Sequence, residues 1–339
     1  MDKVERAVDD IRRKYVPDSR LGVFEMSLLP QQIAGATSSR DALNALRRLA
    51  QQSGLSDQLR LLPDPLVRDE AAIVTAAVAP LLAEPTLSAS RVSEALHGEP
   101  LALLERQGDW LRVRAWDDYV AWVNAGYVAT GPVDWATDWD GRATARSLGA
   151  EVYTPAGRRR LPTGARVALR RTRSARAKSG ETVELADGQR GSIVSGAIRA
   201  EKELRVEARH LALPELAQKW YAGAPYLWGG RTEWGIDCSG LVQAVYAARG
   251  IRLPRDSDQQ FGTGKEVPMS PTGEGYEAGD LLFFTEKGRV SHVAFWAGAG
   301  RIVHAALSRG GVGEELRSRS RSEGRRRLRS GIRSASSPW

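Results

Sequence analysis

The hydrophobic pattern of the first 75 residues changes between helical and strand-like spacing. Residues 1–14 place their apolar side chains along one side of a charged helix. The run Leu21–Met26 has the composition of a strand. Ser39 then opens a second helix that carries an apolar stripe of leucines. We therefore predict a small α/β cap over residues 1–75.

Two strand-rich segments follow, and they look like a diverged repeat. The first contains strand patterns at Trp110–Arg114 and Tyr119–Val123, and the second contains one at Thr182–Leu185. Glycine and aspartate turns separate such strands at intervals of about ten residues. This pattern predicts two small β-barrels, over residues 76–136 and 137–207. Because the second is rich in arginine and poor in aromatic residues, we expect it to support the fold rather than to bind a ligand.

From residue 208 to 310 helical and strand patterns alternate, which predicts a third, α+β domain. Cys238 stands directly before a helical apolar stripe that ends near Gly250. His292 lies in an alternating strand pattern, and His304 lies in a second short strand. The side chains suited to catalysis therefore gather in this domain.

Composition and charge narrow the possible classes of protein. The chain has 339 residues, of which 42% are hydrophobic and 27% charged, which is ordinary for a globular protein of several domains. Its single cysteine excludes a disulfide framework and any metal site built from several cysteines. The net charge of +8 comes mainly from residues 317–333, which hold eight Arg and one Glu. We assign residues 311–339 to a basic, solvated tail and expect no nucleic-acid partner.

The sequence also carries expectations about location. No apolar run reaches the length of about 18 residues that a membrane span needs. The charged start, Met1–Arg6, lacks the apolar core of a signal peptide. We therefore expect a cytoplasmic protein, or an exported one if a leader has been removed. The oligomeric state cannot be read from the sequence.

Cys238 is the candidate nucleophile. A thiol at the start of a helix faces the positive end of the helix dipole, which favours the thiolate and lowers the pKa from its free value of about 8.5. Asp237 and Ser239 are suited to the first turn of that helix. The alternative for a lone cysteine is an inert, buried side chain. The polar neighbours disfavour it, because a core cysteine is expected among apolar residues.

His292 and His304 are the candidate partners of the thiol. If both strands face the start of the helix, His292 can take the thiol proton and His304 can fix the tautomer of its ring. The alternative for each is an ordinary core or surface histidine. A zinc site is a further alternative, which we disfavour because Cys238, His292 and His304 lack the short spacing of metal ligands. We therefore predict no metal.

Several motifs in this domain, taken in order, resemble those of the NlpC/P60 family. They are Asp237–Leu241, Gly279–Leu281, Ser291–Val293 and then His304. The resemblance covers roughly residues 211–310. It implies a papain-like fold, in which the cysteine lies on a helix packed against a small antiparallel sheet. It also implies hydrolysis of bacterial peptidoglycan peptides, commonly after γ-linked D-glutamate, without a cofactor.

The preceding segments add to the resemblance. Gly108–Val113 and Tyr119–Val123 are similar to bacterial SH3 domains, while the second barrel matches them weakly. A cap, two such domains and this catalytic domain together resemble the γ-D-glutamyl-L-diamino acid endopeptidases of murein-peptide recycling. In that group the first SH3 domain closes one end of the cleft and selects a free N-terminal L-Ala. The substrate contacts implied are Glu84 and Tyr119 for the ammonium group, and Tyr226, Trp228, Asp237, Ser239, Asp256 and Ser257 elsewhere in the cleft.

Three functions remain open at this point. The first is a cysteine peptidase that cuts the γ-D-glutamyl-diamino acid bond of murein peptides with a free N-terminal L-Ala. The second is a hydrolase of intact extracellular peptidoglycan, which would require export. The third is a catalytically inactive cell-wall peptide-binding protein, which the intact Cys238, His292 and His304 disfavour. The sequence does not distinguish diaminopimelate from lysine as the leaving residue.

Overall fold

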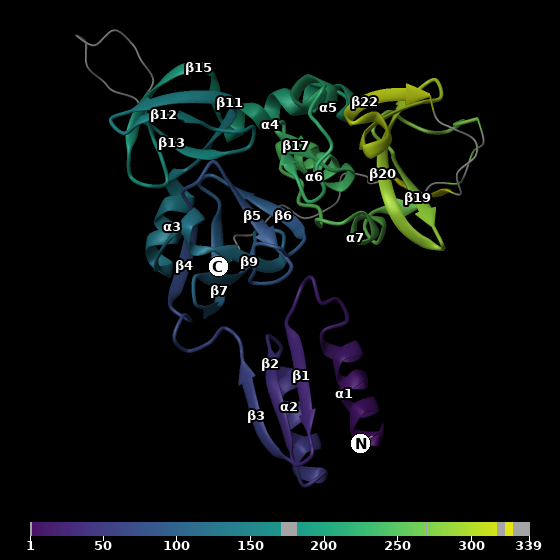
Figure 1. Cartoon of the computed structure of the whole chain (residues 1–339). Helices are drawn as coiled ribbons and strands as arrows, with labels where there is room; N and C mark the ends of the chain where they lie inside the picture. Colours follow the sequence, from purple (N-terminus) through teal and green to yellow (C-terminus); the bar gives the residue numbers. More distant parts are fainter. Residues whose placement is uncertain are drawn as a thin grey trace.

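The computed structural model describes residues 2–170, 182–266, 268, 270, 272–316 and 323–327. Within them the chain forms four main sheets, of three, seven, five and six strands in chain order. Figure 1 shows them as successive bodies, from the purple cap to the yellow-green sheet at the C-terminal end. This mixed arrangement of helices and strands confirms the predicted α+β class.

The cap is a three-stranded sheet covered by two helices. Its elements are α1 (Asp2–Tyr15), β1 (Phe24–Leu29), β2 (Gln32–Thr37), α2 (Arg40–Gln52) and β3 (Ser56–Leu61). Strand β2 pairs antiparallel with β1 and parallel with β3. Ser39 is the N-cap of α2, as the pattern predicted, since its side chain accepts a hydrogen bond from the Ala42 N–H. The strand expected at residues 21–26 begins three residues later, at Phe24.

The first barrel is a seven-stranded sheet in the order β10-β4-β7-β8-β9-β5-β6. Its strands are β4 (Glu70–Val74), β5 (Val78–Leu82), β6 (Arg91–Leu96), β7 (Pro100–Gln107), β8 (Trp110–Arg114), β9 (Val120–Asn124) and β10 (Val128–Pro132), with the 3-10 turn η1 (Ala125–Tyr127) before β10. The sheet begins six residues before the predicted start at residue 76. The reason is that residues 71–74 are all buried, so β4 lacks the polar alternation that marks a half-exposed strand.

The second barrel follows helix α3 (Val133–Arg142) and has the strand order β12-β11-β13-β14-β15. Its strands are β11 (Ala145–Thr154), β12 (Gly157–Arg160), β13 (Arg166–Arg170), β14 (Thr182–Glu184) and β15 (Arg190–Ala200). Pairing of β11 with β15 closes the sheet. His97 ties the two barrels together: its Nδ1 lies 3.0 Å from the carbonyl oxygen of Thr75, and its Nε2 accepts the Ala186 N–H at 3.1 Å. Part of the arginine-rich run, residues 171–181, lies outside the described residues.

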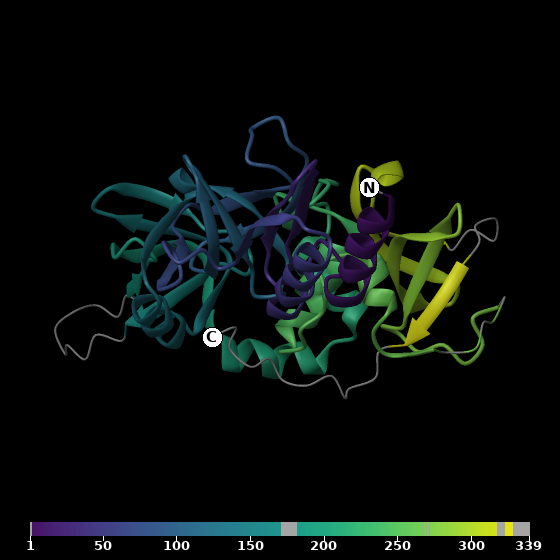
Figure 2. The same cartoon turned by 90° about the horizontal axis from the view of Figure 1, so that it is seen from below.

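The catalytic domain packs helices on one side of an antiparallel sheet (Figures 1 and 2). Its helices are α4 (Glu201–His210), α5 (Leu213–Tyr221), α6 (Cys238–Ala248) and α7 (Ser257–Phe261), with the 3-10 turn η2 (Leu307–Arg309). A small hairpin joins β16 (Arg231–Thr232) to β17 (Gly235–Ile236). The main sheet contains β18 (Lys265–Glu266), β19 (Leu281–Glu286), β20 (Arg289–Gly298), β21 (Arg301–Ala306), β22 (Gly311–Leu316) and β23 (Glu323–Arg327).

The catalytic sheet runs past residue 310, where the sequence placed the end of this domain. Its strand order is β18-β23-β19-β20-β21-β22, so both β22 and β23 belong to it. The sequence missed β22 because its Gly-Val-Gly-Glu-Glu-Leu run has little apolar alternation; the pairing with β21 decides its structure. The rest of the predicted tail, residues 317–322 and 328–339, lies outside the described residues. None of the helices in the described ranges has the length and apolarity to cross a bilayer.

Candidate active site

Cys238 is the first residue of α6, and its position depends on a tight turn before the helix. Asp237 is the N-cap, and its Oδ1 accepts the Gly240 N–H at 2.7 Å. A Cβ on Gly240 would lie 2.3 Å from the carbonyl oxygen of Gly230, so a side chain there would push this turn away. Cys238 itself is 7% exposed. The turn therefore delivers a nearly buried thiol to the tip of the helix, as the sequence predicted.

The pKa of this thiol differs from the expectation. Burial raises the pKa of Cys238 to about 12, and the negative charge of Asp237 adds to this effect. Hydrogen bonds from the backbone N–H groups of Val293 and Ser239 act in the opposite direction, together with the charge of Arg255. The Ser239 N–H is the helix-terminus contribution that the sequence suggested, but desolvation outweighs it. The raised pKa runs against the prediction of a lowered one and favours the protonated thiol at rest.

His292 lies on β20 and His304 on β21, so neighbouring strands bring them together. Their ring atoms His292 Nε2 and His304 Nδ1 are 2.7 Å apart, a hydrogen-bond distance. His304 is 4% exposed, and its Nε2 lies 3.2 Å from Oε1 of Glu315 on β22. Three adjacent strands thus carry a chain of three polar side chains.

The His292–His304 hydrogen bond and the nearby Glu315 carboxylate together indicate where the ring protons lie. If the Glu315 carboxylate favours the proton on Nε2 of His304, Nδ1 of His304 accepts a hydrogen bond from the Nε2–H of His292. Nδ1 of His292 is then the nitrogen that can take a proton from the thiol. The Val293 N–H, one residue along β20, hydrogen-bonds the Cys238 sulfur. The sulfur therefore lies against β20, beside the residue that follows His292.

Glu315 was not among the predicted site residues. The sequence assigned it to the basic tail, because no local pattern shows that residues 311–316 form a strand beside His304. In the structure His304 pairs across β21 and β22 with Gly313, two residues before Glu315. The one signal in the sequence was a glutamate a short distance after the second histidine. In other enzymes a carboxylate of this kind orients the catalytic imidazole.

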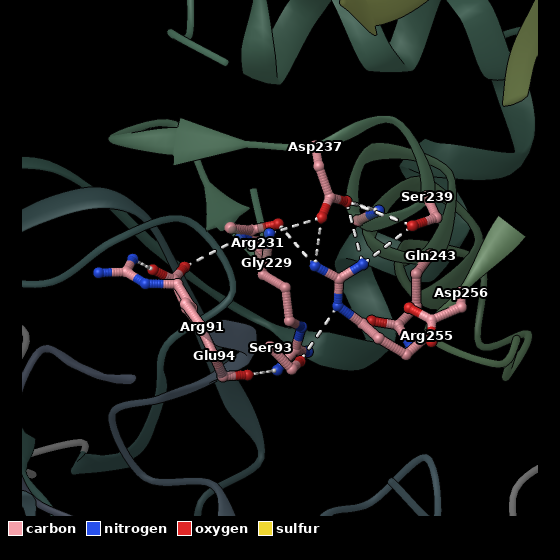
Figure 3. A network of polar contacts seen from close by, with 12 residues as sticks. Arg91, Ser93, Glu94, Gly229, Arg231, Asp237, Ser239, Gln243, Arg255 and Asp256 are labelled. Atoms are coloured by element: carbon pink, nitrogen blue, oxygen red, sulfur yellow. Dashed lines mark hydrogen bonds and ion pairs between the residues drawn. The ribbon is translucent and has the colours of Figure 1, made fainter. Parts of the chain in front are cut away.

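Arg255 is a second residue that the sequence analysis passed over. Its side chain has no exposed surface, and its Nη1 and Nη2 bond the two Asp237 oxygens at 3.0 and 2.7 Å. It also bonds the Ser239 Oγ at 3.0 Å and the Ser93 Oγ at 3.1 Å (Figure 3). Burial alone would lower the pKa of Arg255, but the Asp237 carboxylate outweighs it and holds the pKa above its usual value. Asp237 and Ser239, expected to line the cleft, are thus both committed to this buried network.

The network continues into the first barrel. Arg231 bonds Glu99 at 3.0 and 3.1 Å, and its backbone N–H donates to Glu94 at 2.9 Å. Glu94 also pairs with Arg91, and burial raises the pKa of Glu94. These contacts join β6 and the loop after it to the segment that leads into α6 (Figure 3). The barrel therefore helps to hold the turn that presents Cys238.

Tyr119 and Asp256 meet at the junction of the first barrel and α7. The Tyr119 O–H donates to Asp256 Oδ2 at 3.1 Å, and burial raises the pKa of Tyr119 well above its usual value. Burial likewise raises the pKa of Asp256, against the charges of Arg255 and Arg20. The structure thus brings Tyr119, expected near the substrate ammonium, together with Asp256, expected elsewhere in the cleft. Glu84 lies exposed on the loop between β5 and β6, so its contact with the substrate stays a prediction.

The other predicted cleft residues are placed as follows. Tyr226 is near the thiol, since burial and then the charge of Cys238 raise its pKa to about 12. Trp228 is 65% exposed, and Ser257 is buried as the first residue of α7.

Among the described residues, His, Cys, Asp and Glu side chains form no group of three arranged for a metal ion. A cavity of about 400 Å³ lies between both barrels and the back of α6, and its lining contains none of the predicted site residues.

Comparison with known proteins agrees with this architecture. A model of the NlpC/P60 family matches residues 223–327. These residues are an NlpC/P60 domain. A model described as a bacterial dipeptidyl-peptidase SH3 domain matches residues 81–126, within the first barrel. The chain therefore contains an NlpC/P60 domain and, before it, a bacterial SH3 domain, as the resemblance implied.

Two relatives show where the similarity lies. The γ-D-glutamyl-L-lysine dipeptidyl-peptidase of Bacillus subtilis (strain 168) is 40% identical over 89 residues, which are 25% of this chain and 29% of that protein. Dipeptidyl-peptidase 6 of Lysinibacillus sphaericus is 29% identical over 251 residues, 70% of this chain and 88% of that protein. The match thus spans less than a third of the first relative but most of the second.

A solved structure supports the same fold over about three quarters of the chain. The NlpC/P60 family protein from Bacillus cereus ATCC 10987 superposes with a TM-score of 0.60 over 76% of this chain and 100% of that chain, at 20% sequence identity. This likeness bears on the fold alone. It covers more of this chain than the NlpC/P60 domain.

Proposed function

We propose that this NlpC/P60 peptidase is a cysteine endopeptidase that cuts the γ-D-glutamyl-diamino acid bond of murein peptides with a free N-terminal L-Ala. The observation that carries the proposal is the buried thiol of Cys238, hydrogen-bonded by the N–H of Val293 next to His292, together with the His292–His304 hydrogen bond and the Glu315 carboxylate 3.2 Å from His304. The name of the Bacillus subtilis relative supports the γ-D-glutamyl bond as the target.

The proposed reaction follows from the protonation states. The Cys238 thiol is protonated at rest, so His292 takes the proton as the sulfur attacks the carbonyl carbon. The backbone N–H of Cys238 at the helix start stabilises the oxyanion, a contribution of about 3 kcal/mol in other enzymes. His292 then gives its proton to the leaving amine, and a thioester remains. Water, deprotonated by His292, hydrolyses the thioester and regenerates the thiol. No cofactor takes part.

The proposed substrate end group follows from the junction of Tyr119 and Asp256. A half-buried carboxylate favours a cation, because a charge taken out of water needs a charged or hydrogen-bonding partner. Asp256 lies at the meeting point of the first barrel and the catalytic domain. A free N-terminal ammonium bound there would place a dipeptide unit between this junction and Cys238. The contacts proposed for Glu84, Tyr226, Trp228 and Ser257 complete that cleft.

The mechanism is tested by replacing the nucleophile. We expect Cys238→Ala to abolish release of the diamino acid from L-Ala-γ-D-Glu-diaminopimelate while the circular dichroism spectrum and melting temperature stay near those of the native protein. The loss follows because no other residue in the proposed site can form the thioester. Residual turnover at the native rate in this variant would refute the cysteine mechanism.

The same assay separates the proposed substrate from intact peptidoglycan. We expect turnover of the free tripeptide and little lysis of purified sacculi, since a cleft closed by the first barrel excludes a polymer. Strong lysis of sacculi would instead favour a hydrolase of the intact wall. The proposed cytoplasmic location is tested separately by fractionation of the producing cells, where recovery in the culture medium would contradict it.

A further inference from the structure

The connection between α1 and β1 lies against the residues expected to bind the amino end of the substrate. Arg20 in this connection belongs to the cap, which neither matched family model reaches. Its carbonyl oxygen accepts the Val120 N–H at 2.7 Å, directly after Tyr119. In Figure 1 this connection is the end of the cap that points towards α7. The cap is therefore anchored where the first barrel meets the catalytic domain.

The guanidinium of Arg20 gives five hydrogen bonds to three carboxylates. It bonds Asp18 at 2.9 and 2.8 Å, and Asp258 at 2.8 Å twice. Its Nη1 also bonds Asp256 Oδ2 at 2.9 Å, the same oxygen that accepts the Tyr119 O–H. Since a guanidinium has five N–H donors, Arg20 has none left over. Gln259 donates to Asp18 at 2.8 Å and adds a further bond between the cap and α7.

These contacts suit a role in holding Asp256 rather than in cancelling its charge. A carboxylate has about four acceptor positions, so two donors on Oδ2 leave capacity for an ammonium. Asp18, Asp256 and Asp258 face the one guanidinium of Arg20, and Arg255 is a second cation near Asp256. Without Arg20, three carboxylates would repel one another and Asp256 would turn towards water or become neutral. Arg20 therefore keeps a charged Asp256 in one orientation.

We propose that Arg20 is a positioning residue for the amino-end subsite, so that the cap forms part of the substrate site. This inference rests on the proposed function, because the ammonium belongs to the proposed substrate. The first barrel and the catalytic domain form two sides of the proposed subsite. Residues 18–20 of the cap would form the third side, and no matched family model covers them.

The first test compares two peptides on full-length variants. The peptides are L-Ala-γ-D-Glu-diaminopimelate and its N-acetylated counterpart, which lacks the ammonium. For Arg20→Gln we expect KM for the free-amine peptide to rise about three- to tenfold with little change in kcat, because a binding contact is weakened and not the chemistry. The preference for the free amine over the acetylated peptide should fall by the same factor. Arg13→Gln is the matched control, since Arg13 pairs with Asp9 and Asp10 on the surface of the same cap.

The second test needs no substrate. Hydrogen exchange of residues 254–262 should be faster in Arg20→Gln than in the native protein, and unchanged in Arg13→Gln. Two results for Arg20→Gln would overturn the role of Arg20 and leave the peptidase function intact. One is an unchanged preference for the free-amine peptide over the acetylated one, and the other is an equal loss of turnover on both peptides. If the native protein turned over neither peptide, the proposed function would fail. The exchange of residues 254–262 would then decide whether Arg20 holds Asp256, and unchanged exchange would overturn that claim too.

Discussion

Burial and the helix terminus have opposite effects on the pKa of Cys238: burial raises it, and the backbone N–H at the helix start lowers it. The N–H groups of Ser239 and Val293 stabilise the thiolate, but the cost of taking that charge out of water is larger. In the proposed mechanism the thiol is therefore a weak nucleophile until His292 removes its proton. Catalysis then depends on the geometry of the histidine series rather than on a preformed thiolate.

This argument predicts how the free enzyme reacts with iodoacetamide. Because the pKa of Cys238 is raised to about 12, the thiolate fraction falls tenfold for each pH unit below it. We expect the alkylation rate to rise about tenfold per pH unit between pH 6 and 9, without a plateau. Mass spectrometry of the single cysteine measures the rate. A plateau below pH 7 would show that His292 holds a thiolate at rest and would contradict the protonated thiol.

Glu315 is expected to act through His304. Glu315→Gln keeps the shape of the side chain but removes the negative charge beside the His304 ring. A favourable contact with a charged group is worth about 1.5–3 kcal/mol, so we expect kcat to fall about ten- to hundredfold with KM nearly unchanged. Steady-state kinetics on the tripeptide measure this. Glu314→Gln is the control, because Glu314 pairs with Arg301 and Gln218 instead. Equal effects of both variants would contradict a specific role for Glu315.

Helix α6 owes its position to contacts that come from other elements. Asp237 caps the helix, and Arg255, from the loop between α6 and α7, neutralises that carboxylate inside the protein. Ser93 and Glu94 of β6 then fix Arg255 and Arg231, respectively. The helix that carries the nucleophile is therefore set in place by a buried ionic network shared with the first barrel (Figure 3).

Breaking this network should be costly. Arg255→Met leaves the Asp237 carboxylate buried without its cation, so we expect the free energy of unfolding to fall by about 3–5 kcal/mol. The double variant Arg255→Met/Asp237→Asn removes both charges and should recover part of that loss. Urea denaturation of both variants measures the difference. If the double variant were no more stable than Arg255→Met, the uncompensated charge would not be the cause.

For the molecule as a whole, the junctions between domains matter as much as the domains. Arg20 and Asp18 join the cap to α7, Glu94 and Arg231 join the first barrel to the catalytic domain, and His97 joins the two barrels. His97 must be neutral to do so, because its Nε2 accepts the Ala186 N–H.

The His97 junction predicts a pH dependence. Burial lowers the pKa of His97 below the unfolded value of about 6.5, so below that pH the unfolded chain binds the extra proton first. The free energy of unfolding should therefore fall as pH drops below 6.5, by up to about 1.4 kcal/mol per unit, until the folded pKa is reached. Urea midpoints between pH 7 and 5 measure the slope. His97→Gln should flatten it, whereas the exposed His210→Asn should not; equal slopes in all three proteins would contradict this assignment.

Much of the local structure was predictable because it follows from short-range patterns. The helix that starts at Cys238, the two strands of His292 and His304, and the N-cap at Ser39 all depend on neighbours within a few positions. The motif order also identified the NlpC/P60 domain. By contrast, β4 and β22 were missed, because one is buried on all its central residues and the other has no apolar alternation.

The sequence by itself determined which residues are chemically able to act: one cysteine, two histidines on adjacent strands, and a capped helix to carry the thiol. Tertiary structure decided what surrounds them. Desolvation, which depends on every neighbouring atom, raises the thiol pKa against the helix dipole. Glu315, Arg255 and Arg20 reach the site from positions with no local signal, because strand pairing and domain packing bring distant residues together. Long-range contacts of this kind leave no periodic pattern in the chain.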